Sequence, residues 1–174
     1  MAERFLLDRT ATPIGELFVV VDTDGRLRTV DWTDHEARAL RLLRIHYGND
    51  LRLEPARDPG GMTAAMRAYF SGDLGAIDRL PTATAGTSFQ REVWKALRGI
   101  RCGTTISYAE LARRIGRDSA VRAVGLANGS NPISIVVPCH RVIGSNGTLT
   151  GYGGGLERKR WLLAHEGAAL AQAA

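Results

Sequence analysis

The chain has 174 residues, of which 44% are hydrophobic and 24% charged, a composition typical of a globular protein with one or two small domains. No apolar run approaches the length of about 20 residues that a membrane helix needs, so we expect no membrane partner. The two cysteines form no CxxC pair and the four histidines do not cluster. We therefore expect free thiols, a cytoplasmic location and no bound metal.

The net charge of +5 is distributed unevenly along the chain. Residues 1–87 hold 11 Lys and Arg against 13 Asp and Glu, whereas residues 88–174 hold 12 against 5. The basic second half favours a polyanionic partner, because each neutralised phosphate releases condensed counterions. A solvated arginine-rich surface would give the same count, so charge alone leaves both interpretations open.

The first part of the chain, residues 1–80, is predicted to be an α+β domain. Segments with strand composition, separated by turn residues, predict a three-stranded antiparallel sheet: Arg4–Thr10, Glu16–Asp22 and Arg26–Trp32. Apolar residues at helical spacing predict two helices, His35–Tyr47 and Gly61–Phe70. Small residues at positions 81–87 then indicate a linker.

The second part, residues 88–174, is predicted to be mainly helical. Capping-box sequences at Thr87–Gln90 and Ser107–Glu110 predict the starts of helices Phe89–Leu97 and Tyr108–Ile115. A tight turn and a third helix, Ala120–Ala127, follow. Two short helices around a glycine-bearing turn form a helix-turn-helix arrangement, although many helical hairpins with this pattern bind nothing. The closing helix is predicted at Leu156–Glu166, with Gly167 as its C-cap.

A candidate nucleophile, Cys139, lies between these helices. The apolar, β-branched segment Ile133–Val137 ends at Pro138, which predicts a buried strand with the thiol at its end. His140 follows directly, and nearby cations lower the pKa of a thiol. These residues alone leave two alternatives: an activated thiolate, or a small buried hydrophobic side chain.

Several motifs of the second half occur together: Pro138-Cys139-His140-Arg141-Val142, Arg122-Ala123-Val124-Gly125, Asn131-Pro132, Tyr152-Gly153-Gly154-Gly155 and Leu163-Ala164-His165-Glu166-Gly167. With this combination the chain resembles the O6-alkylguanine-DNA alkyltransferases, also called methylated-DNA–protein-cysteine methyltransferases. The resemblance is dense over residues 87–167 and looser over 1–86. It implies a ribonuclease-H-like N-terminal domain and a winged-helix-like C-terminal domain containing the helix-turn-helix.

The activity that this resemblance implies is DNA repair by direct, irreversible transfer of an alkyl group to Cys139. The substrate is O6-alkylguanine, and also O4-alkylthymine, in double-stranded DNA, and each protein molecule acts once. The lesion nucleotide leaves the stack through the minor groove. No cofactor is implied. We expect a monomer in solution, while cooperative binding along DNA and the range of alkyl sizes stay open.

The resemblance assigns four residues to the transfer step. Cys139 accepts the alkyl group, and His140 removes the thiol proton through a water, because adjacent side chains on an extended chain point to opposite sides. Glu166 orients and stabilises His140, as a carboxylate does in a catalytic triad. Asn131 braces the active-site turn. A surface charge at a helix end is the alternative for Glu166.

DNA contacts and the base pocket are also assigned by the resemblance. Arg122 fills the place of the extruded base, and Tyr108 faces that base, with a buried core tyrosine as the alternative. Other DNA-binding residues are Ala123, Gly125 and Ser130. The base pocket consists of Tyr108, Val142, Ser145, Tyr152, Gly153 and Gly154. We also expect one phosphate contact among Arg113, Arg114 and Arg117.

Two other classes of protein fit part of the pattern. A non-catalytic lesion-binding protein of the alkyltransferase-like type would lack a cysteine at position 139. An unrelated cysteine hydrolase using Cys139 and His140 would need neither the helix-turn-helix nor Arg122. The glycine triplet at 153–155 does not match the GxGxxG pattern of a phosphate-binding loop.

Overall fold

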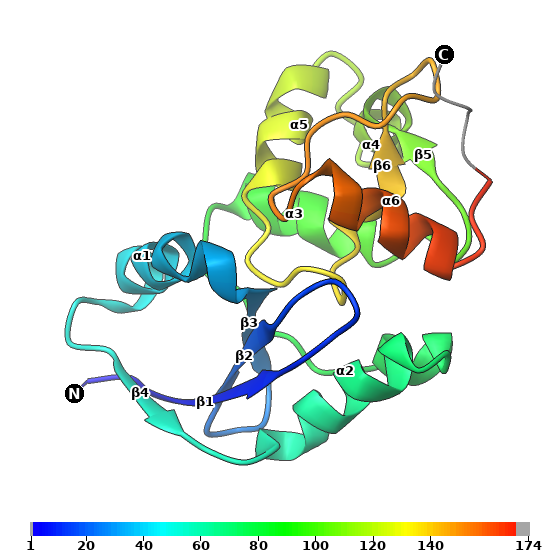
Figure 1. The fold of residues 1–174 in the computed structure, drawn as a ribbon. Coiled ribbons are helices and arrows are strands. Elements are labelled where there is room, and N and C mark those ends of the chain that lie inside the picture. The colour runs from blue at the N-terminus through cyan, green and yellow to red at the C-terminus, as the bar shows by residue number, and fades with distance from the viewer. Residues whose placement is uncertain (1, 170–174) are drawn as a thin grey trace. The chain divides into compact units, whose positions relative to one another are not determined.

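The computed structural model describes residues 2–169 and separates into two compact units, Met1–Gly86 and Thr87–Ala174 (Figure 1). Six α-helices, two small sheets and several short 3-10 turns make up the described part of the chain. No helix within residues 2–169 is long and apolar enough to cross a membrane.

The N-terminal unit contains a four-stranded mixed sheet. Its strands are β1 (Arg4–Thr10), β2 (Leu17–Asp22), β3 (Leu27–Trp32) and β4 (Arg52–Pro55), in the order β3-β2-β1-β4. β1 to β3 form the predicted antiparallel ladder, and each starts within one residue of its predicted position. The hairpin between β2 and β3 is closed by Asp22, whose Oδ1 accepts from the N–H groups of Asp24 and Arg26.

The prediction of a purely antiparallel three-stranded sheet was wrong, because β4 pairs in parallel with β1. β4 is only four residues long, has two charged side chains and ends at Pro55, so it lacks the alternating apolar pattern of a strand. Proline is tolerated there because β4 is an edge strand.

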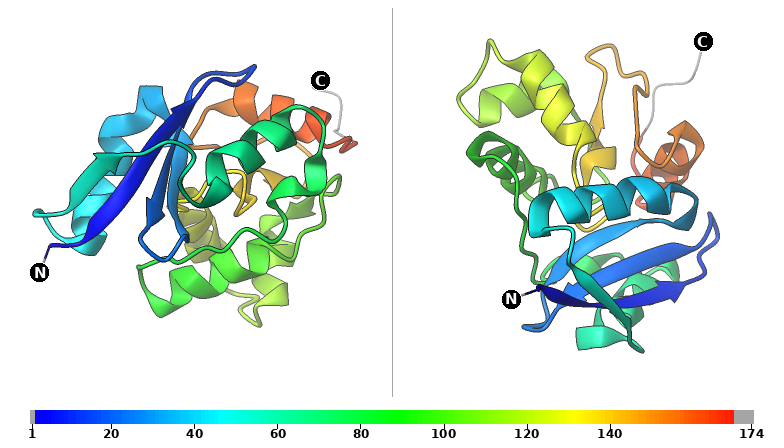
Figure 2. Two further views of the ribbon diagram at one scale, coloured as in Figure 1. Left: turned by 90° about the horizontal axis from the view of Figure 1, so that it is seen from below. Right: turned by 90° about the vertical axis from the view of Figure 1, so that its left-hand side faces the viewer.

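Two helices cover the opposite faces of this sheet, α1 (Glu36–Tyr47) and α2 (Met62–Phe70), as the right-hand view of Figure 2 shows. Every residue of β2 is buried, as expected for a central strand covered on both sides. On the α1 side, the core consists of Phe5, Phe18, Val20, Ala39 and Leu43. Three 3-10 turns complete the unit: Thr33–His35, Pro59–Gly61 and Leu74–Ile77.

The C-terminal unit is helical around a two-stranded parallel pair. Its elements are α3 (Ser88–Leu97), β5 (Ile106–Ser107), α4 (Tyr108–Arg114), α5 (Val121–Gly129), β6 (Val142–Ile143) and α6 (Leu156–His165). The predicted helices are confirmed to within two residues at their ends. Gly167 follows α6 with a φ of 75°, the left-handed conformation of a C-cap.

Only one of the two predicted capping boxes is complete. At α3, the Gln90 N–H donates to Thr87 Oγ1 and the Thr87 N–H donates to Gln90 Oε1. At α4, Ser107 Oγ accepts from the Glu110 N–H at 3.0 Å, but the Glu110 carboxylate accepts from Arg113 and Arg114 instead. The single hydrogen bond from the Ser107 cap is enough to start the helix at Tyr108.

The short β5–β6 pair was not predicted, and it positions the candidate site. Ile106 pairs with Val142 and Ser107 pairs with Ile143. This pairing places the N-terminus of α4 beside the segment that directly follows Cys139 and His140.

Candidate active site

The segment before the thiol is a tight turn and not the predicted strand. Ile133–Val137 is buried as expected, but the Val137 N–H donates to the Ile133 carbonyl and the Val136 N–H donates to the Ser134 carbonyl. Ile135 has a φ of 74°, which is strained for a β-branched residue. β-Branched composition predicts burial in an extended strand, but here tertiary contacts hold the backbone in a turn.

Asn131 holds this turn together. Its Nδ2 donates to the Val137 carbonyl at 2.7 Å and to the Ile133 carbonyl at 3.4 Å. Its Oδ1 accepts from the Ile133 N–H at 3.0 Å. A single side chain therefore satisfies three backbone groups and closes the chain immediately before Pro138 and Cys139.

Asn131→Ala is expected to lower the free energy of unfolding by about 1–3 kcal/mol, because it leaves the Ile133 N–H of a buried turn without its partner and removes one of two hydrogen bonds from the Ile133 and Val137 carbonyls. Urea denaturation measures this loss. Asn49→Ala, at an exposed turn position in the N-terminal unit, is the control and should change stability by less than about 0.5 kcal/mol. Equal stability of the two variants would contradict the bracing role of Asn131.

Cys139 begins a one-turn 3-10 helix, Cys139–Arg141, and only 7% of its surface is exposed. The Cys139 N–H donates to the Val137 carbonyl, and the Arg141 N–H donates to the Pro138 carbonyl. The expectation of an extended chain through Cys139 and His140 was therefore wrong. The inference of a water-mediated contact loses its geometric premise, since side chains in a helical turn do not alternate across a strand.

His140 is fully buried and contacts Glu166 across 26 residues of sequence. Its Nε2 lies 3.0 Å from Glu166 Oε2. The structure therefore brings His140 together with the carboxylate that the resemblance assigned to orient it. His140 Nδ1 is also buried and has no hydrogen-bond partner within residues 2–169.

The electrostatics of this cluster determine which imidazole nitrogen can act as a base. Burial would raise the pKa of Glu166, but hydrogen bonds from His140 and Arg141 outweigh it and hold that pKa well below its usual value. Burial lowers the pKa of His140, against the opposing effect of Glu166. An ionised carboxylate only accepts hydrogen bonds, so neutral His140 carries its proton on Nε2. Nδ1 then carries a lone pair and is the ring nitrogen that can accept a proton.

Arg141 completes the cluster, a role that the sequence analysis did not assign. Its Nε donates to Glu166 Oε1 at 2.8 Å and its Nη2 donates to Glu166 Oε2 at 2.9 Å, a bidentate pair. Its Nη1 donates to the Ile100 carbonyl at 2.7 Å. Glu166 is therefore a buried, paired carboxylate, and the alternative of a surface charge at a helix end is wrong.

Lys159 is the second residue of this site that the sequence analysis missed. It is fully buried, and its Nζ donates to the carbonyls of Val142 and Thr150 at 2.7 Å and of Gly151 at 3.3 Å. Burial lowers the pKa of Lys159 to about 8, whereas negative charge on Cys139 raises it. The ammonium therefore fastens both ends of the 143–151 loop and attracts a thiolate at Cys139.

Helical periodicity could have identified Lys159. On α6 the buried positions are Lys159, Leu162, Leu163 and Glu166, spaced as i, i+3, i+4 and i+7. Charged side chains are rarely fully buried unless they are paired. A charged residue at a buried position of an amphipathic helix therefore indicates a functional or hydrogen-bonded group.

Lys159→Met is expected to lower the reactivity of Cys139 toward iodoacetamide at pH 7 by roughly fivefold to tenfold, because the nearby positive charge favours the thiolate. Methionine keeps the apolar length of the side chain, and hydrogen exchange of the 148–151 backbone should become faster. Lys95→Met, at the exposed other lysine of the chain, is the matched control. Identical thiol reactivity in the two variants would argue against the electrostatic link.

Tyr108 lies where α4, α5 and the loop that carries Thr150 come together. It is half-buried at the start of α4, and its hydroxyl accepts from Thr150 Oγ1 at a long 3.5 Å. A Cβ on Gly125 of α5 would meet the Tyr108 ring at 3.8 Å. Glycine at position 125 thus lets α5 and Tyr108 approach each other.

The helix α5 has one side exposed to solvent and one side buried against α3. Arg122 and Ala123 are exposed, whereas Val124, Ala127 and Asn128 are buried, and Trp94 Nε1 of α3 donates to the Ala127 carbonyl at 2.8 Å. Ser130 ends the helix, where its Oγ donates to the Ala127 carbonyl. The rotation of α5 is therefore set by α3, and Arg122 is held on the outside.

Comparison with known proteins identifies the family of this chain. Residues 88–168 match the family model of the 6-O-methylguanine DNA methyltransferase DNA-binding domain. A Shigella flexneri protein named methylated-DNA–protein-cysteine methyltransferase is 57% identical over 165 residues, which cover 94% of this chain and 96% of that relative. The chain belongs to the methylated-DNA–protein-cysteine methyltransferase family.

Solved structures of this family share the fold. Mycobacterium tuberculosis OGT, solved in complex with DNA, superposes with a TM-score of 0.77 at 39% identity, over 94% of this chain and 92% of that one. The O6-methylguanine methyltransferase of the same organism gives a TM-score of 0.75 at 38% identity, over 98% of this chain and 96% of that one. The similarity extends through both compact units.

The residues assigned to the base pocket lie within or next to the 143–151 loop that Lys159 holds, apart from Tyr108, which contacts Thr150 of that loop. Val142 and Gly154 are buried, Tyr152 is half-buried, and Ser145 and Gly153 are exposed. Gly144 allows this loop to fold tightly, because a Cβ there would approach Asn146 Oδ1 to 3.0 Å and the Thr148 carbonyl to 3.2 Å.

The three arginines considered for phosphate contact all form ion pairs. Arg113 and Arg114 contact Glu110 at 2.6 Å and 3.1 Å, and Arg117 contacts Glu92 at 3.3 Å. A phosphate would have to compete with these carboxylates, so the expectation that one of the three binds phosphate stays a prediction.

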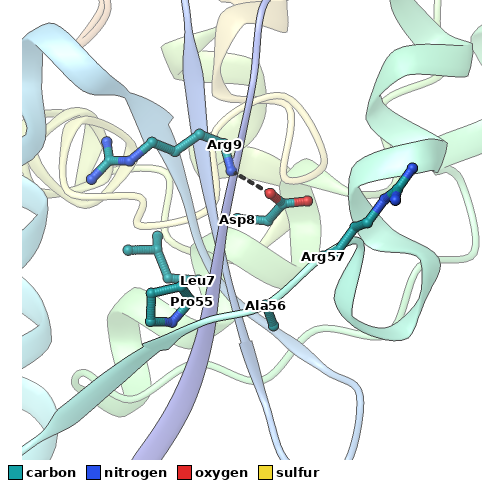
Figure 3. Close-up of a pocket in the computed structure, with 6 residues that line it drawn as sticks. All are labelled: Leu7, Asp8, Arg9, Pro55, Ala56 and Arg57. Carbon is teal, nitrogen blue, oxygen red and sulfur yellow. Dashed lines mark hydrogen bonds between the residues drawn. The ribbon is translucent and has the colours of Figure 1, made fainter.

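A separate cavity of about 520 Å³ lies in the N-terminal unit, where β4 ends beside β1 (Figure 3). Its lining residues are Leu7, Asp8, Arg9, Pro55, Ala56 and Arg57. The Asp8 carboxylate accepts from the Arg9 N–H at 2.8 Å and from the Asp58 N–H at 2.9 Å. These hydrogen bonds to the backbone give Asp8 a structural role. The cavity contains neither a thiol nor an imidazole.

Cys102 is half-buried and forms no disulfide with Cys139. The turn that carries it lies against α6, since a Cβ on Gly103 would meet the Glu166 carbonyl at 3.0 Å. Among the described residues 2–169, no three His, Cys, Asp or Glu side chains lie close enough to hold a metal ion.

Proposed function

We propose that this chain repairs O6-alkylguanine, and O4-alkylthymine, in double-stranded DNA by moving the alkyl group to Cys139 in a single turnover. The observation that carries the proposal is a nearly buried thiol followed by an imidazole whose Nε2 is held by an ionised carboxylate. The family match over residues 88–168 and the DNA complex of the Mycobacterium tuberculosis relative support duplex DNA as the partner.

The transfer step balances without a cofactor. His140 Nδ1 takes the proton of the Cys139 thiol, and the sulfur attacks the alkyl carbon opposite its bond to O6. The new sulfur–carbon bond forms as the carbon–oxygen bond breaks. The bonding electrons stay on the base, which then takes a proton and becomes unmodified guanine. The product is a thioether on Cys139, and because the carbon–sulfur bond of a thioether is stable in water, each protein molecule acts once.

Access to the thiol requires that the damaged nucleotide leave the duplex. Cys139 is 7% exposed, so a stacked base cannot reach it. In this proposal the base enters beside Tyr108 and the 142–152 loop, while Arg122, exposed on α5, occupies the vacated place. The protein acts as a monomer in the cytoplasm.

We also propose which known fold each of the two units resembles. The β3-β2-β1-β4 order, with β4 parallel to β1 after α1, supports a ribonuclease-H-like relationship for the N-terminal sheet. The α4–turn–α5 arrangement supports a winged-helix-like DNA reader. Both relationships leave the transfer chemistry to the C-terminal unit.

The two alternative functions are less well supported. A lesion-binding protein without transfer activity has no use for a cysteine beside an imidazole held by Glu166. A cysteine hydrolase would need repeated entry of water to a site in which the thiol is nearly buried, and it would not need the exposed Arg122 on α5.

Intact mass spectrometry tests the proposed function. After incubation with a duplex oligonucleotide containing one O6-methylguanine, the protein should gain one methyl group, located by peptide mapping on Cys139. The oligonucleotide should contain ordinary guanine in equal amount. Methylation elsewhere, or release of methanol with unmodified protein, would overturn the proposal.

Arg122→Ala is expected to weaken binding to duplex DNA and to slow transfer from duplex substrates by roughly tenfold to a hundredfold, because the extruded state loses the group that fills the gap. Rapid-quench transfer assays measure the rate. Arg57→Ala, which removes an equally charged, exposed side chain from the N-terminal unit, is the matched control. An unchanged duplex rate in Arg122→Ala would contradict the proposal that Arg122 occupies the place of the extruded base.

A further inference from the structure

Leu126 on α5 is an exposed aliphatic side chain that the transfer mechanism does not use. It is 73% exposed, more than Ile45, Leu156 or Val121, the other exposed large hydrophobic residues of the described chain. It lies four residues after Arg122, so both project from the same side of the helix.

The outward orientation of Leu126 is imposed by the packing of α5. The opposite side of α5 is buried, and the Trp94–Ala127 hydrogen bond fixes that side against α3. Rotating the helix to cover Leu126 would expose Val124 and Asn128 and break this bond. The exposure is thus a stable feature of the fold, and it costs solvation free energy unless a partner covers it.

The chemistry of the outer face of α5 selects one kind of partner. Its exposed residues are Val121, Arg122, Ala123, Leu126 and Gly129. Only Arg122 is charged, so at most one side chain of this face could hydrogen-bond to base edges in the major groove. Small and apolar side chains beside one cation suit the minor groove, where apolar residues pack on sugars and wedge against base steps. The basic surplus of residues 88–174 favours the same polyanion.

We propose that Leu126 is a DNA-contacting residue that packs against the minor-groove wall one helical turn from Arg122 and supports the nucleotide-extruded state. This inference rests on the proposed function and adds a residue to it. An apolar contact carries no sequence information, so it raises affinity for duplex DNA at any site. It also removes from water the leucine surface that the free protein exposes.

The test compares Leu126→Ala with Ile45→Ala, which removes an equally exposed aliphatic side chain, 69% exposed, from α1 of the N-terminal unit. Affinity for an O6-methylguanine duplex is measured by fluorescence anisotropy at several salt concentrations. Leu126→Ala should bind about tenfold more weakly. Its slope of log affinity against log salt should stay that of the parent, because no phosphate contact is lost. Ile45→Ala should bind like the parent, and Leu126→Met should recover most of the affinity.

Three results would overturn this inference. One is a Leu126→Ala affinity equal to that of Ile45→Ala. Another is a changed salt slope, which would mean that the substitution acts through charge. The third is a shift of the parent from dimer to monomer in Leu126→Ala by light scattering, which would assign the patch to a second copy of the chain. If the parent itself accepts no methyl group, the proposed function fails; if it does and Leu126→Ala binds normally, only this inference fails.

Discussion

A Cys139→Ser protein is expected to accept no alkyl group from O6-methylguanine DNA, with the transfer rate reduced by at least about a thousandfold. A serine hydroxyl is a far weaker nucleophile than a thiolate at neutral pH, and His140 alone does not make it an alkoxide. Serine has nearly the same shape as cysteine, and position 139 is only 7% exposed. Lesion binding should therefore remain close to that of the parent.

Cys102→Ser is the control for this experiment. Cys102 lies in the turn before β5, and it forms no disulfide that its loss could disturb. Single-turnover transfer should stay at the parent rate in this variant. Methylation of the Cys139→Ser protein, or loss of transfer in Cys102→Ser, would reassign the acceptor.

Glu166→Gln is expected to destabilise the protein by about 3–5 kcal/mol and to slow alkyl transfer by roughly tenfold to a hundredfold. The amide leaves the Arg141 guanidinium buried without its ionic partner, and breaking one side of a buried ion pair carries a cost of this size. Transfer slows because a neutral partner no longer stabilises the imidazolium that forms as His140 takes the thiol proton.

The matched control for this substitution is Glu92→Gln. The Glu92 carboxylate also pairs with an arginine, Arg117, but both side chains are substantially exposed. Exposed pairs contribute only about 0–1 kcal/mol, so the control should unfold nearly like the parent. Similar losses in the two variants would show that burial of the Glu166 cluster is not what makes it important.

The same cluster predicts how stability depends on pH. The folded pKa of Glu166 lies below its unfolded value, so its contribution is complete above about pH 4.3 and is lost as the pH falls through the folded pKa. The folded pKa of His140 is also lowered, so the unfolded chain takes up a proton first as the pH falls below about 6.5. Urea midpoints should therefore decrease from pH 7 to about pH 2.5, and Glu166→Gln should flatten the part below about pH 4.3.

Local signals were sufficient for most of the secondary structure. The Thr87 and Ser107 caps start α3 and α4 where the sequence predicts, and the hairpin closed by Asp22 aligns β2 with β3. β4 was missed because its pairing with β1 comes from a distant part of the chain and leaves no alternating pattern in four residues. The turn at Ile133–Val137 was mistaken for a strand because Asn131 imposes a backbone that β-branched residues do not favour.

Some residues of the site could likewise be predicted from the sequence, and others could not. The neighbouring thiol and imidazole of Cys139 and His140 are visible in the sequence, and the surrounding motifs pointed to Glu166 as the partner. The contacts of Arg141 with Glu166 and with the Ile100 carbonyl, and the three carbonyls held by Lys159, were not foreseen, because they join segments between 8 and 41 residues apart. Periodicity on α6 would have exposed Lys159 as a charge on a buried stripe.

The sequence by itself determined the candidate nucleophile, the helices that surround it and the basic half of the chain, because these depend on residue chemistry and on contacts within a few positions. Only the tertiary structure decided which nitrogen of His140 can take a proton. That choice requires Glu166 to be ionised, buried and 3.0 Å away, and burial and distance arise only when α6 folds against the turn that carries Cys139. Protonation follows from the local electric environment, which a linear sequence does not contain.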